Sequence, residues 1–209
     1  MLLAIHPARY PARLDVDYPQ KLDRLTTFFR PILVIPIGII LILLPASSGI
    51  SIQIGETLGN SGSAIAIATA LMIVFRQRYP RWWFDFAREL VRFSARIGAY
   101  LLLLTDQYPS TVDEQSVHLE IDYPDAKRDL NRWLPLVKWF LAIPHYIVLA
   151  VLAIIALFAV VFAWFAILIT GRYPRALFDF VVGVDRWCLR VTAYAFLLVT
   201  DLYPPFSLS

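Results

Sequence analysis

No charged residue interrupts the stretch from Trp139 to Gly171, WFLAIPHYIVLAVLAIIALFAVVFAWFAILITG. An α-helix rises about 1.5 Å per residue, and about 20 apolar residues cross a bilayer. The stretch is therefore long for one upright crossing and short for two. The rest of the chain has a similar character, since 59% of its 209 residues are hydrophobic and 17% are charged. This composition indicates an integral membrane protein and excludes a disordered chain, a nucleic-acid-binding arm and an ordinary cytosolic enzyme.

Short motifs occur twice along the chain in the same order, which indicates an internal duplication. The motif LDVDYP at 14–19 returns as LEIDYP at 119–124, and RYPR at 78–81 returns at 172–175. We divide the chain into a first repeat, residues 1–110, and a second repeat, residues 111–209.

Each repeat opens with a short segment in which apolar and charged residues alternate. Leu14 and Val16 alternate with Asp15, and Leu119 and Ile121 flank Glu120 in the same way. A period of two predicts a half-buried strand. A single strand would leave its backbone unpaired, so we expect the two strands to pair as a small ribbon at the membrane surface. Its apolar face would rest on helices or lipid headgroups.

A polar loop at 46–62 divides the apolar residues of the first repeat. By the logic of the duplication, each repeat is predicted to contain a transmembrane hairpin of two helices. The predicted helices are 25–45 with 63–78, and 133–153 with 156–171. Pro36 and Pro144 are expected to kink the first helix of each hairpin.

Each repeat ends in a predicted amphipathic helix, 82–104 or 176–200. In the first, the polar residues recur every three or four positions and form one stripe. Such a helix can lie at the membrane interface, or it can cross the membrane with its polar stripe turned inward. These two placements give four or six membrane crossings.

The distribution of basic residues favours four crossings. All 19 Lys and Arg residues lie outside the 46–62 loop, whose single charged residue is Glu56. Because cytoplasmic loops are enriched in Lys and Arg, we place the basic segments and both termini in the cytoplasm. The predicted fold is therefore an all-α integral membrane protein of the inner (plasma) membrane. It is a tandem repeat of a two-helix transmembrane hairpin plus an amphipathic interfacial helix, with a strand before each hairpin.

Eight arginines are candidate contacts for anionic lipid headgroups, because a guanidinium group binds phosphate bidentately. They are Arg78, Arg81, Arg92, Arg96, Arg172, Arg175, Arg186 and Arg190. The alternative is structural: such arginines anchor an interfacial helix and pair with nearby carboxylates, and the RYPR turns end one helix and begin the next.

The sequence contains no recognisable catalytic, metal-binding or cofactor-binding motif. It has one cysteine and three widely separated histidines. It has no phosphate-binding loop, no HExxH and no GxSxG. We therefore predict a protein that is not an enzyme, with no cofactor, no metal and no nucleic-acid partner.

Several motifs of the second repeat together resemble a bacterial membrane family catalogued as DUF4389, a domain of unknown function. They are IPHY at 143–146, TGRYPRALFDF at 170–180, RVTAY at 190–194 and DLYPPF at 201–206. The first repeat is more divergent, with Ile37-Gly38 in place of the family's His-Tyr. The family has no assigned activity, so the resemblance implies a fold and a membrane location and no chemistry.

The favoured function is a non-catalytic accessory or scaffold subunit of a larger membrane assembly, in contact with the lipid bilayer and partner helices. One alternative is a small transporter or channel built on the duplicated unit. The other is a membrane protein that binds or modifies anionic lipids through the arginines.

Overall fold

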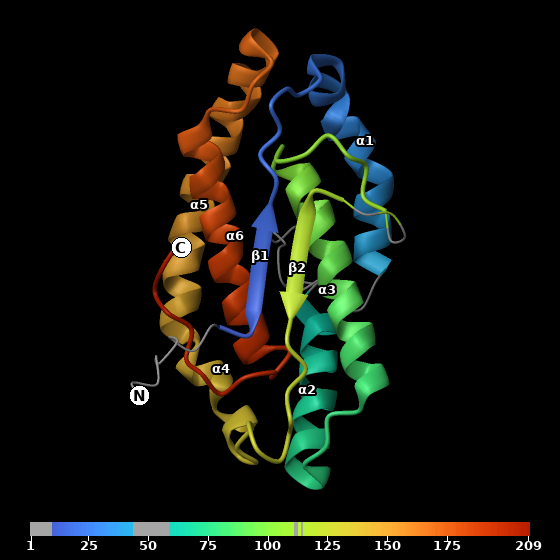
Figure 1. The fold of residues 1–209 in the computed structure, drawn as a ribbon, viewed down its shortest axis with the longest axis vertical. Helices are drawn as coiled ribbons and strands as arrows, with labels where there is room; N and C mark the ends of the chain where they lie inside the picture. The colour runs from blue at the N-terminus through green and yellow to red at the C-terminus, as the bar shows by residue number, and fades with distance from the viewer. Residues whose placement is uncertain (1–9, 44–58, 111–112, 114) are drawn as a thin grey trace, which may run out of the picture.

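The computed structural model describes residues 10–43, 59–110, 113 and 115–209. Within these ranges the chain forms a two-stranded sheet, six α-helices and one short 3-10 helix (Figure 1). In chain order they are β1 (Ala12–Val16), α1 (Arg24–Leu43), α2 (Gly59–Arg76), α3 (Arg81–Leu101), β2 (Val117–Ile121), the 3-10 helix η1 (Leu134–Leu136), α4 (Lys138–Leu141), α5 (Ile143–Thr170) and α6 (Arg175–Ala195).

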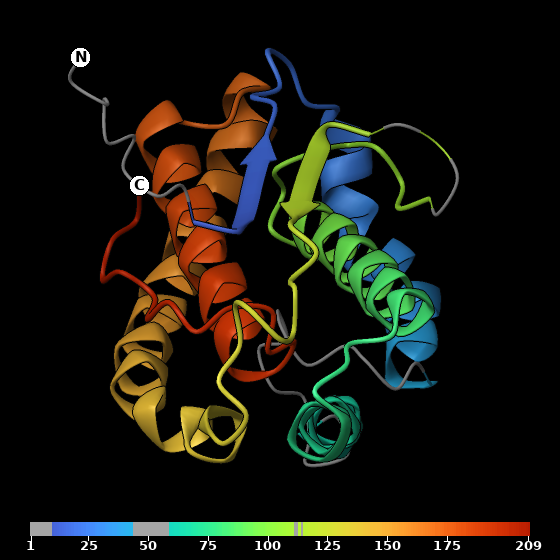
Figure 2. The same ribbon diagram turned by 60° about the horizontal axis from the view of Figure 1, so that its bottom comes forward.

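The strands form the predicted ribbon. β1 and β2 pair antiparallel, with Leu14 opposite Leu119. Burial alternates along both strands, so Leu14, Val16, Leu119 and Ile121 are buried. Each strand packs on the amphipathic helix of the other repeat: β1 contacts α6, and β2 contacts α3 (Figure 2). The two repeats are thus interleaved, because each supplies the strand that covers the other.

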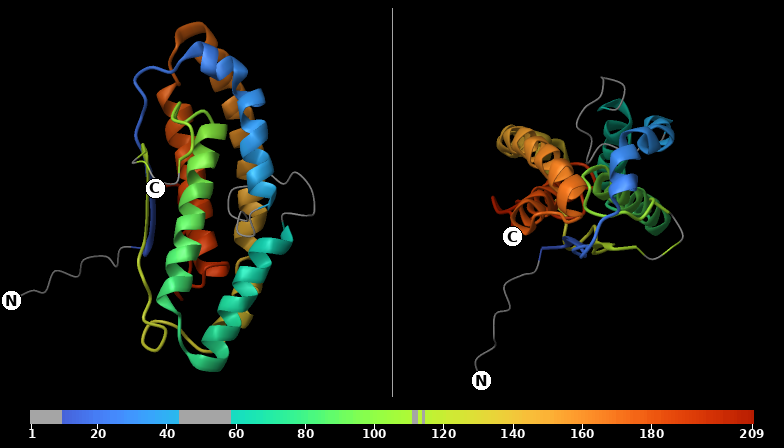
Figure 3. Two further views of the ribbon diagram at one scale, coloured as in Figure 1. Left: turned by 90° about the vertical axis from the view of Figure 1, so that its right-hand side faces the viewer. Right: turned by 90° about the horizontal axis from the view of Figure 1, so that it is seen from above.

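The elements lie in three layers, which the side view separates (Figure 3). The ribbon forms one outer layer, α3 and α6 form the middle, and α1 and α5 lie on the far side. Both α3 and α6 begin directly after the Pro of an RYPR turn, as predicted. Their placement differs from the prediction, because the ribbon packs on one side of them and α1 and α5 lie on the other. They are middle-layer helices, and only part of each polar side is exposed.

The second repeat contains one long helix where a transmembrane hairpin was predicted. α5 runs unbroken from Ile143 to Thr170, because the residues around the expected turn, 154–155, include no glycine, proline or polar residue. The helix ends at Gly171, whose left-handed conformation (φ 72°) lets its N–H bond to the carbonyl of Ile167. Pro144 lies in the first turn, where no intrahelical hydrogen bond is lost, so it does not interrupt the helix.

The predicted fold class is therefore wrong. In the first repeat, α1 and α2 are separate helices, and most of the predicted 46–62 loop falls outside the described residues, while 59–62 belong to α2. Among the described residues, α5 alone is long and apolar enough to cross a membrane. A tandem repeat of transmembrane hairpins does not describe the chain.

Candidate functional site

A buried cation joins the first helix of the first repeat to the end of α3. Arg30, on α1, is 2% exposed. One of its terminal nitrogens donates to the carbonyl oxygen of Tyr100 (2.9 Å), and the other forms an ion pair with Asp106. The guanidinium also lies 4.5 Å from the centre of the Tyr100 ring. A hydrogen bond, an ion pair and a cation–π contact therefore hold the guanidinium group of Arg30 in place.

The second repeat builds the same arrangement with a lysine. The Nζ atom of Lys138 lies 2.7 Å from the carbonyl oxygen of Thr200 and 2.7 Å from a carboxylate oxygen of Asp201. It also lies 5.1 Å from the centre of the Tyr194 ring. Burial lowers the pKa of Lys138, and the hydrogen bond and charge of Asp201 oppose that shift. These contacts connect α4 to the segment that follows α6.

Sequence reasoning missed both cations, although a signal exists. Arg30 and Lys138 each precede an Ile-Pro pair, 35–36 or 143–144, by the same number of residues. Each lies immediately before a long uncharged stretch. A basic residue repeated at that position, together with a Thr-Asp repeated after the third helix, indicates an ion pair inside each repeat.

Two of the eight candidate arginines bind the ribbon. Arg92, on α3, donates to the carbonyl oxygen of Leu119 (3.3 Å). Arg186, on α6, donates to the carbonyl oxygen of Leu14 (2.8 Å) and pairs with Asp15 (2.6 Å). These bonds satisfy backbone acceptors of β2 and β1, which fixes each strand to the helix beneath it.

Two further arginines bind segments that follow their own helices. Arg96 donates to the carbonyl oxygen of Ser110. Arg190 is 6% exposed, and one of its terminal nitrogens donates to the carbonyl oxygens of Ser207 (3.2 Å) and Ser209 (2.6 Å). The four arginines of the two helical stripes therefore all have acceptors within the protein.

The other four candidates lie in the exposed RYPR turns. Arg81 lies over the ring of Tyr123 at 5.4 Å, and Arg175 lies over Tyr18 at 4.5 Å. Arg78 and Arg172 are also exposed. The two turns lie at opposite ends of the long axis of the molecule (Figure 1). Binding of anionic lipid by these arginines stays a prediction, and the fold does not gather them into one patch.

His145 lies in an aromatic cluster near the start of α5. Its Nδ1 accepts a hydrogen bond from the indole N–H of Trp187 (3.1 Å). The imidazole stacks on Phe206 at 4.1 Å and lies 4.7 Å from the ring of Tyr203. Within the described part of the chain, no group of three His, Cys, Asp or Glu residues could hold a metal ion. The surroundings of His145 are those of a packed core residue.

Asp185 has no charged counterpart in the other repeat. It lies on α6, immediately before Arg186, and Val91 has the equivalent place on α3. Burial raises the pKa of Asp185 to about 7. The nearby Cys188 is half-buried, and desolvation raises the pKa of its thiol to about 12. Both groups therefore favour their neutral forms, which suits packing more than nucleophilic chemistry.

The outer surfaces of α1 and α5 form what we call the apolar layer. α5 buries a narrow stripe of mostly small residues, Ala156, Ala159, Ala163 and Ile167, and packs against α6. Large apolar side chains elsewhere on the two helices are exposed. They include Leu25, Phe28, Phe29, Ile32, Ile147, Val151, Ile154, Phe158, Phe162, Phe165 and Ile169. The apolar layer lies on the side of the molecule opposite the ribbon (Figure 3).

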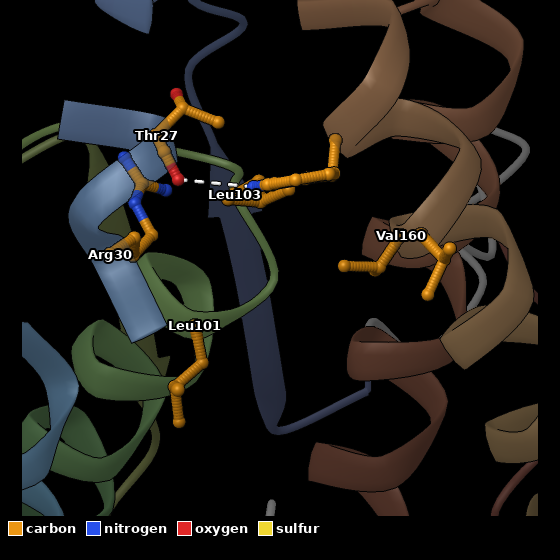
Figure 4. A pocket seen from close by; sticks show the side chains of 7 residues that line it. Thr27, Arg30, Leu101, Leu103 and Val160 are labelled. Atoms are coloured by element: carbon orange, nitrogen blue, oxygen red, sulfur yellow. Dashed lines mark hydrogen bonds between the residues drawn. The ribbon is translucent and has the colours of Figure 1, made fainter. Parts of the chain in front are cut away.

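A cavity of about 350 Å³ lies between α1 and α5 (Figure 4). The end of α3 and the residues after it complete its walls. Its lining is Thr27, Arg30, Leu101, Leu103, Val160, Val161 and Trp164. The indole N–H of Trp164 donates to the backbone carbonyl of Thr27 (3.1 Å), which joins α5 to α1. The volume is at the lower end of the range for small-molecule sites.

These features define a class: a duplicated, mainly helical protein with an apolar side, a charged side and, in the part of the chain that the structure describes, one helix long and apolar enough to cross a membrane. Comparison with known families matches residues 59–112 and 133–207 to the domain of unknown function DUF4389. The chain belongs to the DUF4389 family, and the two matched segments agree with the duplication. No curated protein and no solved structure matches the chain.

Proposed function

We propose that this protein is a non-catalytic accessory or scaffold subunit that sits in the membrane by its apolar layer. The observation that supports this most is α5, which exposes large apolar side chains over most of its circumference. Contiguous apolar surface of this kind is rare on soluble monomers and marks contact with lipid or another protein. Small residues on the buried stripe are typical of helix packing inside membranes.

The contacts of α6 favour an orientation in which the long axis of the molecule lies in the membrane plane. If α5 crossed the membrane upright, α6 and the ribbon would also lie within the bilayer, because α6 packs on α5 and β1 packs on α6. The ribbon exposes four carboxylates, Asp15, Asp17, Glu120 and Asp122. An acidic side chain at the centre of a bilayer costs about 2.5–3.5 kcal/mol on insertion scales. In the flat orientation the ribbon faces water and the apolar layer faces hydrocarbon.

The basic turns support the same orientation. The turn at 78–81, between α2 and α3, lies at one end of the long axis, and the turn at 172–175, between α5 and α6, lies at the other (Figure 1). An upright molecule would put one of these turns on the outer side of the membrane, against the positive-inside rule. A flat molecule keeps both turns and the termini on the cytoplasmic side. A location on the inner membrane with cytoplasmic termini therefore fits, and several full crossings are not needed.

The two alternative functions have weaker support. A transporter needs ionisable residues along a path through the membrane. α5 carries no Asp, Glu, Lys or Arg, and its one histidine, His145, is packed among aromatic side chains near the start of the helix. An anionic-lipid-binding protein needs free arginines, whereas those of the α3 and α6 stripes bind acceptors within the protein. The exposed arginines of the two RYPR turns remain, and the two turns lie at opposite ends of the molecule. A scaffold requires only the surfaces described above.

Membrane attachment is tested with a double substitution in the apolar layer, Phe158→Glu with Phe162→Glu. Wild-type protein is expected to stay in the membrane fraction after a high-pH carbonate wash, and the double variant is expected to be released. The matched control is Leu202→Glu, whose half-exposed side chain lies after α6. Retention of the double variant would contradict attachment through the apolar layer.

The scaffold role is tested by purification in mild detergent followed by mass spectrometry. We expect one membrane protein to co-purify in fixed stoichiometry with wild type and with Leu202→Glu. If all of the protein in the cell is recovered as a monomer without a partner, the accessory role is contradicted. The transporter and lipid-binding alternatives would then be favoured.

A further inference from the structure

We propose that α2 and the η1–α4 segment contact lipid as well as α1 and α5, so that the molecule rests on a single leaflet of the bilayer on a two-fold-symmetric apolar platform. By apolar platform we mean the exposed apolar side chains of α1, α2, η1, α4 and α5 together. Its occupant is the acyl-chain region of that leaflet. This inference rests on the proposed membrane location and adds which surfaces contact lipid and from which side.

The two repeats are related by a two-fold axis that passes through the ribbon. Leu14 lies opposite Leu119, and these residues have the same place in the motifs LDVDYP and LEIDYP. In an antiparallel pair, the two-fold axis between directly opposed residues is perpendicular to the ribbon. Arg92 binds the carbonyl of Leu119, and its equivalent, Arg186, binds that of the other leucine. A perpendicular axis turns each layer onto itself, so equivalent surfaces face the same side of the molecule.

Exposed apolar side chains recur at equivalent positions in α1 and in the η1–α4 segment. When the Ile-Pro pairs at 35–36 and 143–144 are aligned, every exposed large apolar residue between 25 and 35 has an exposed apolar equivalent between 133 and 143. Phe28, for example, is 55% exposed, and its equivalent Leu136 is 53% exposed. The exposed residues of the second repeat are Trp133, Leu136, Val137, Phe140, Leu141 and Ile143. The η1–α4 segment therefore presents the same kind of surface as α1.

α2 repeats the exposed positions of the last turns of α5 in the same way. When the RYPR turns are aligned, Ile67, Leu71 and Phe75 of α2 correspond to Val161, Phe165 and Ile169 of α5, and all six are exposed. Phe75 is 73% exposed and Ile169 is 74% exposed. Figure 3 shows α2 reaching the side of the molecule on which α1 and α5 lie. The two repeats thus contribute equivalent surfaces to that side.

The charges within these segments are turned away from the platform. Segments 25–35 and 133–143 each contain one charged residue, Arg30 or Lys138. The side chain of Arg30 is 3% exposed and that of Lys138 is fully buried, and each pairs with a carboxylate, Asp106 or Asp201. Basic side chains on a surface in water normally keep their charged ends exposed. Burial and pairing are typical of charges at membrane depth, because an exposed charge there would enter hydrocarbon.

Hydrocarbon fits the platform better than a protein partner does. Equivalent side chains often differ in shape: Trp133 replaces Leu25, and Phe140 replaces Ile32. Their apolar character and their exposure are nevertheless kept. A protein interface requires shape complementarity at its core, whereas burial in fluid acyl chains requires only an apolar surface. Because the two halves face the same side, one leaflet can cover both.

The test measures the immersion of nitroxide labels by electron paramagnetic resonance. Single cysteines are introduced into a Cys188→Ala protein, which is labelled and reconstituted in phosphatidylcholine vesicles. Oxygen, which is enriched in hydrocarbon, and a water-soluble nickel complex serve as relaxing agents. The labelled positions are two equivalent pairs, Phe75→Cys with Ile169→Cys and Phe140→Cys with Ile32→Cys.

We expect oxygen to relax all four labels and the nickel complex to lose access to them, with the same depth within each pair. The control is His118→Cys, at an exposed position of the ribbon, which should stay open to the nickel complex. Protection of Phe75→Cys and Phe140→Cys from both relaxing agents would show that a second copy of the chain covers these surfaces, and would overturn the proposal.

The single leaflet is tested along α5. Labels at Ile147→Cys, Ile154→Cys and Ile169→Cys should lie at similar depths, because the long axis of the molecule lies in the membrane plane. A label at Ile154→Cys that lies much deeper than the other two would show that α5 crosses both leaflets, and the platform would be wrong.

The outcomes separate this inference from the proposed function. If the nickel complex reaches Phe75→Cys and Phe140→Cys but not their equivalents on α5 and α1, the platform is overturned and attachment through the apolar layer stands. If it reaches all four positions, or if the protein fails to float with the vesicles, the membrane location itself is wrong.

Discussion

At the scale of single residues, Asp185 is the most unusual group of the middle layer. Its raised pKa means that the folded protein holds this proton between about pH 4 and 7, where the unfolded chain has released it. The folded state then binds more protons than the unfolded state, so Asp185 makes stability fall as pH rises through this range. Above pH 7 the ionised Asp185 carboxylate lowers the free energy of unfolding by its full amount, and below pH 4 it does not lower it.

Replacing Asp185 by Asn should remove that pH dependence. We expect Asp185→Asn to be about 1–3 kcal/mol more stable than wild type at pH 8 and close to wild type at pH 4, allowing for partial solvent screening. Denaturant unfolding in detergent at the two pH values measures this difference. Asp179→Asn, at an exposed position of the same helix, is the control and should show no such effect. An equal shift at both pH values would show that burial does not hold Asp185 neutral.

Lys138 is the residue whose loss should be costliest. Lys138→Met leaves Asp201 without its cation in a poorly hydrated site, and we expect a loss of about 2–4 kcal/mol in the free energy of unfolding. Lys138→Arg reproduces the residue of the first repeat and should be tolerated. The double variant Lys138→Met with Asp201→Asn should recover part of the loss. Thermal midpoints in detergent compare all three, and additive losses in the double variant would contradict the ion pair.

At the scale of elements, the packing of α5 depends on its narrow stripe of small buried residues. Ala163 is fully buried in that stripe. Ala163→Leu should therefore force α5 and α6 apart and cost about 1–3 kcal/mol. Val151→Leu enlarges an exposed position of the same helix and should change stability little. If the thermal midpoints of the two variants move equally, the stripe is not the contact surface between the helices.

Arg186 shows how an element can depend on one long-range hydrogen bond. Arg186→Lys keeps the charge beside Asp15 but loses the geometry that reaches the Leu14 carbonyl as well. We expect a loss of about 1 kcal/mol and faster amide hydrogen exchange in β1. Unchanged exchange in β1 would show that packing on α6 alone holds the strand.

At the scale of the whole molecule, the exchange of strands makes the two repeats interdependent. Residues 1–110 alone would lose the partner that covers α3, and residues 111–209 alone would lose the partner that covers α6. We expect neither fragment to be a stable monomer when it is expressed by itself, and the two to co-purify when they are expressed together. A protease-resistant monomer of either fragment would contradict this interdependence. The domain boundary at 110–111 itself stays a prediction.

The local features of the fold can be predicted from the sequence. Repeated motifs identified the duplication and the family, alternation predicted both strands and their pairing, and RYPR predicted where α3 and α6 begin. These signals are local, because turn chemistry and side-chain period act within a few residues. The same local reasoning failed for 133–171, since the duplication suggested a turn that the residues of α5 do not encode.

What covers each element could not be predicted from local patterns and became clear from the packing of the whole chain. Periodicity shows that α3 and α6 have a polar side, and it does not show that a strand from the other repeat lies on that side. The sequence leaves the arginines of these stripes open between lipid contacts and structural anchors, because acceptors such as Leu14 for Arg186 are distant in sequence. Arg30 and Trp164 likewise come together from different repeats to line one cavity. Contacts between distant residues depend on how the helices pack, and the amphipathic pattern of a single helix is compatible with several partners.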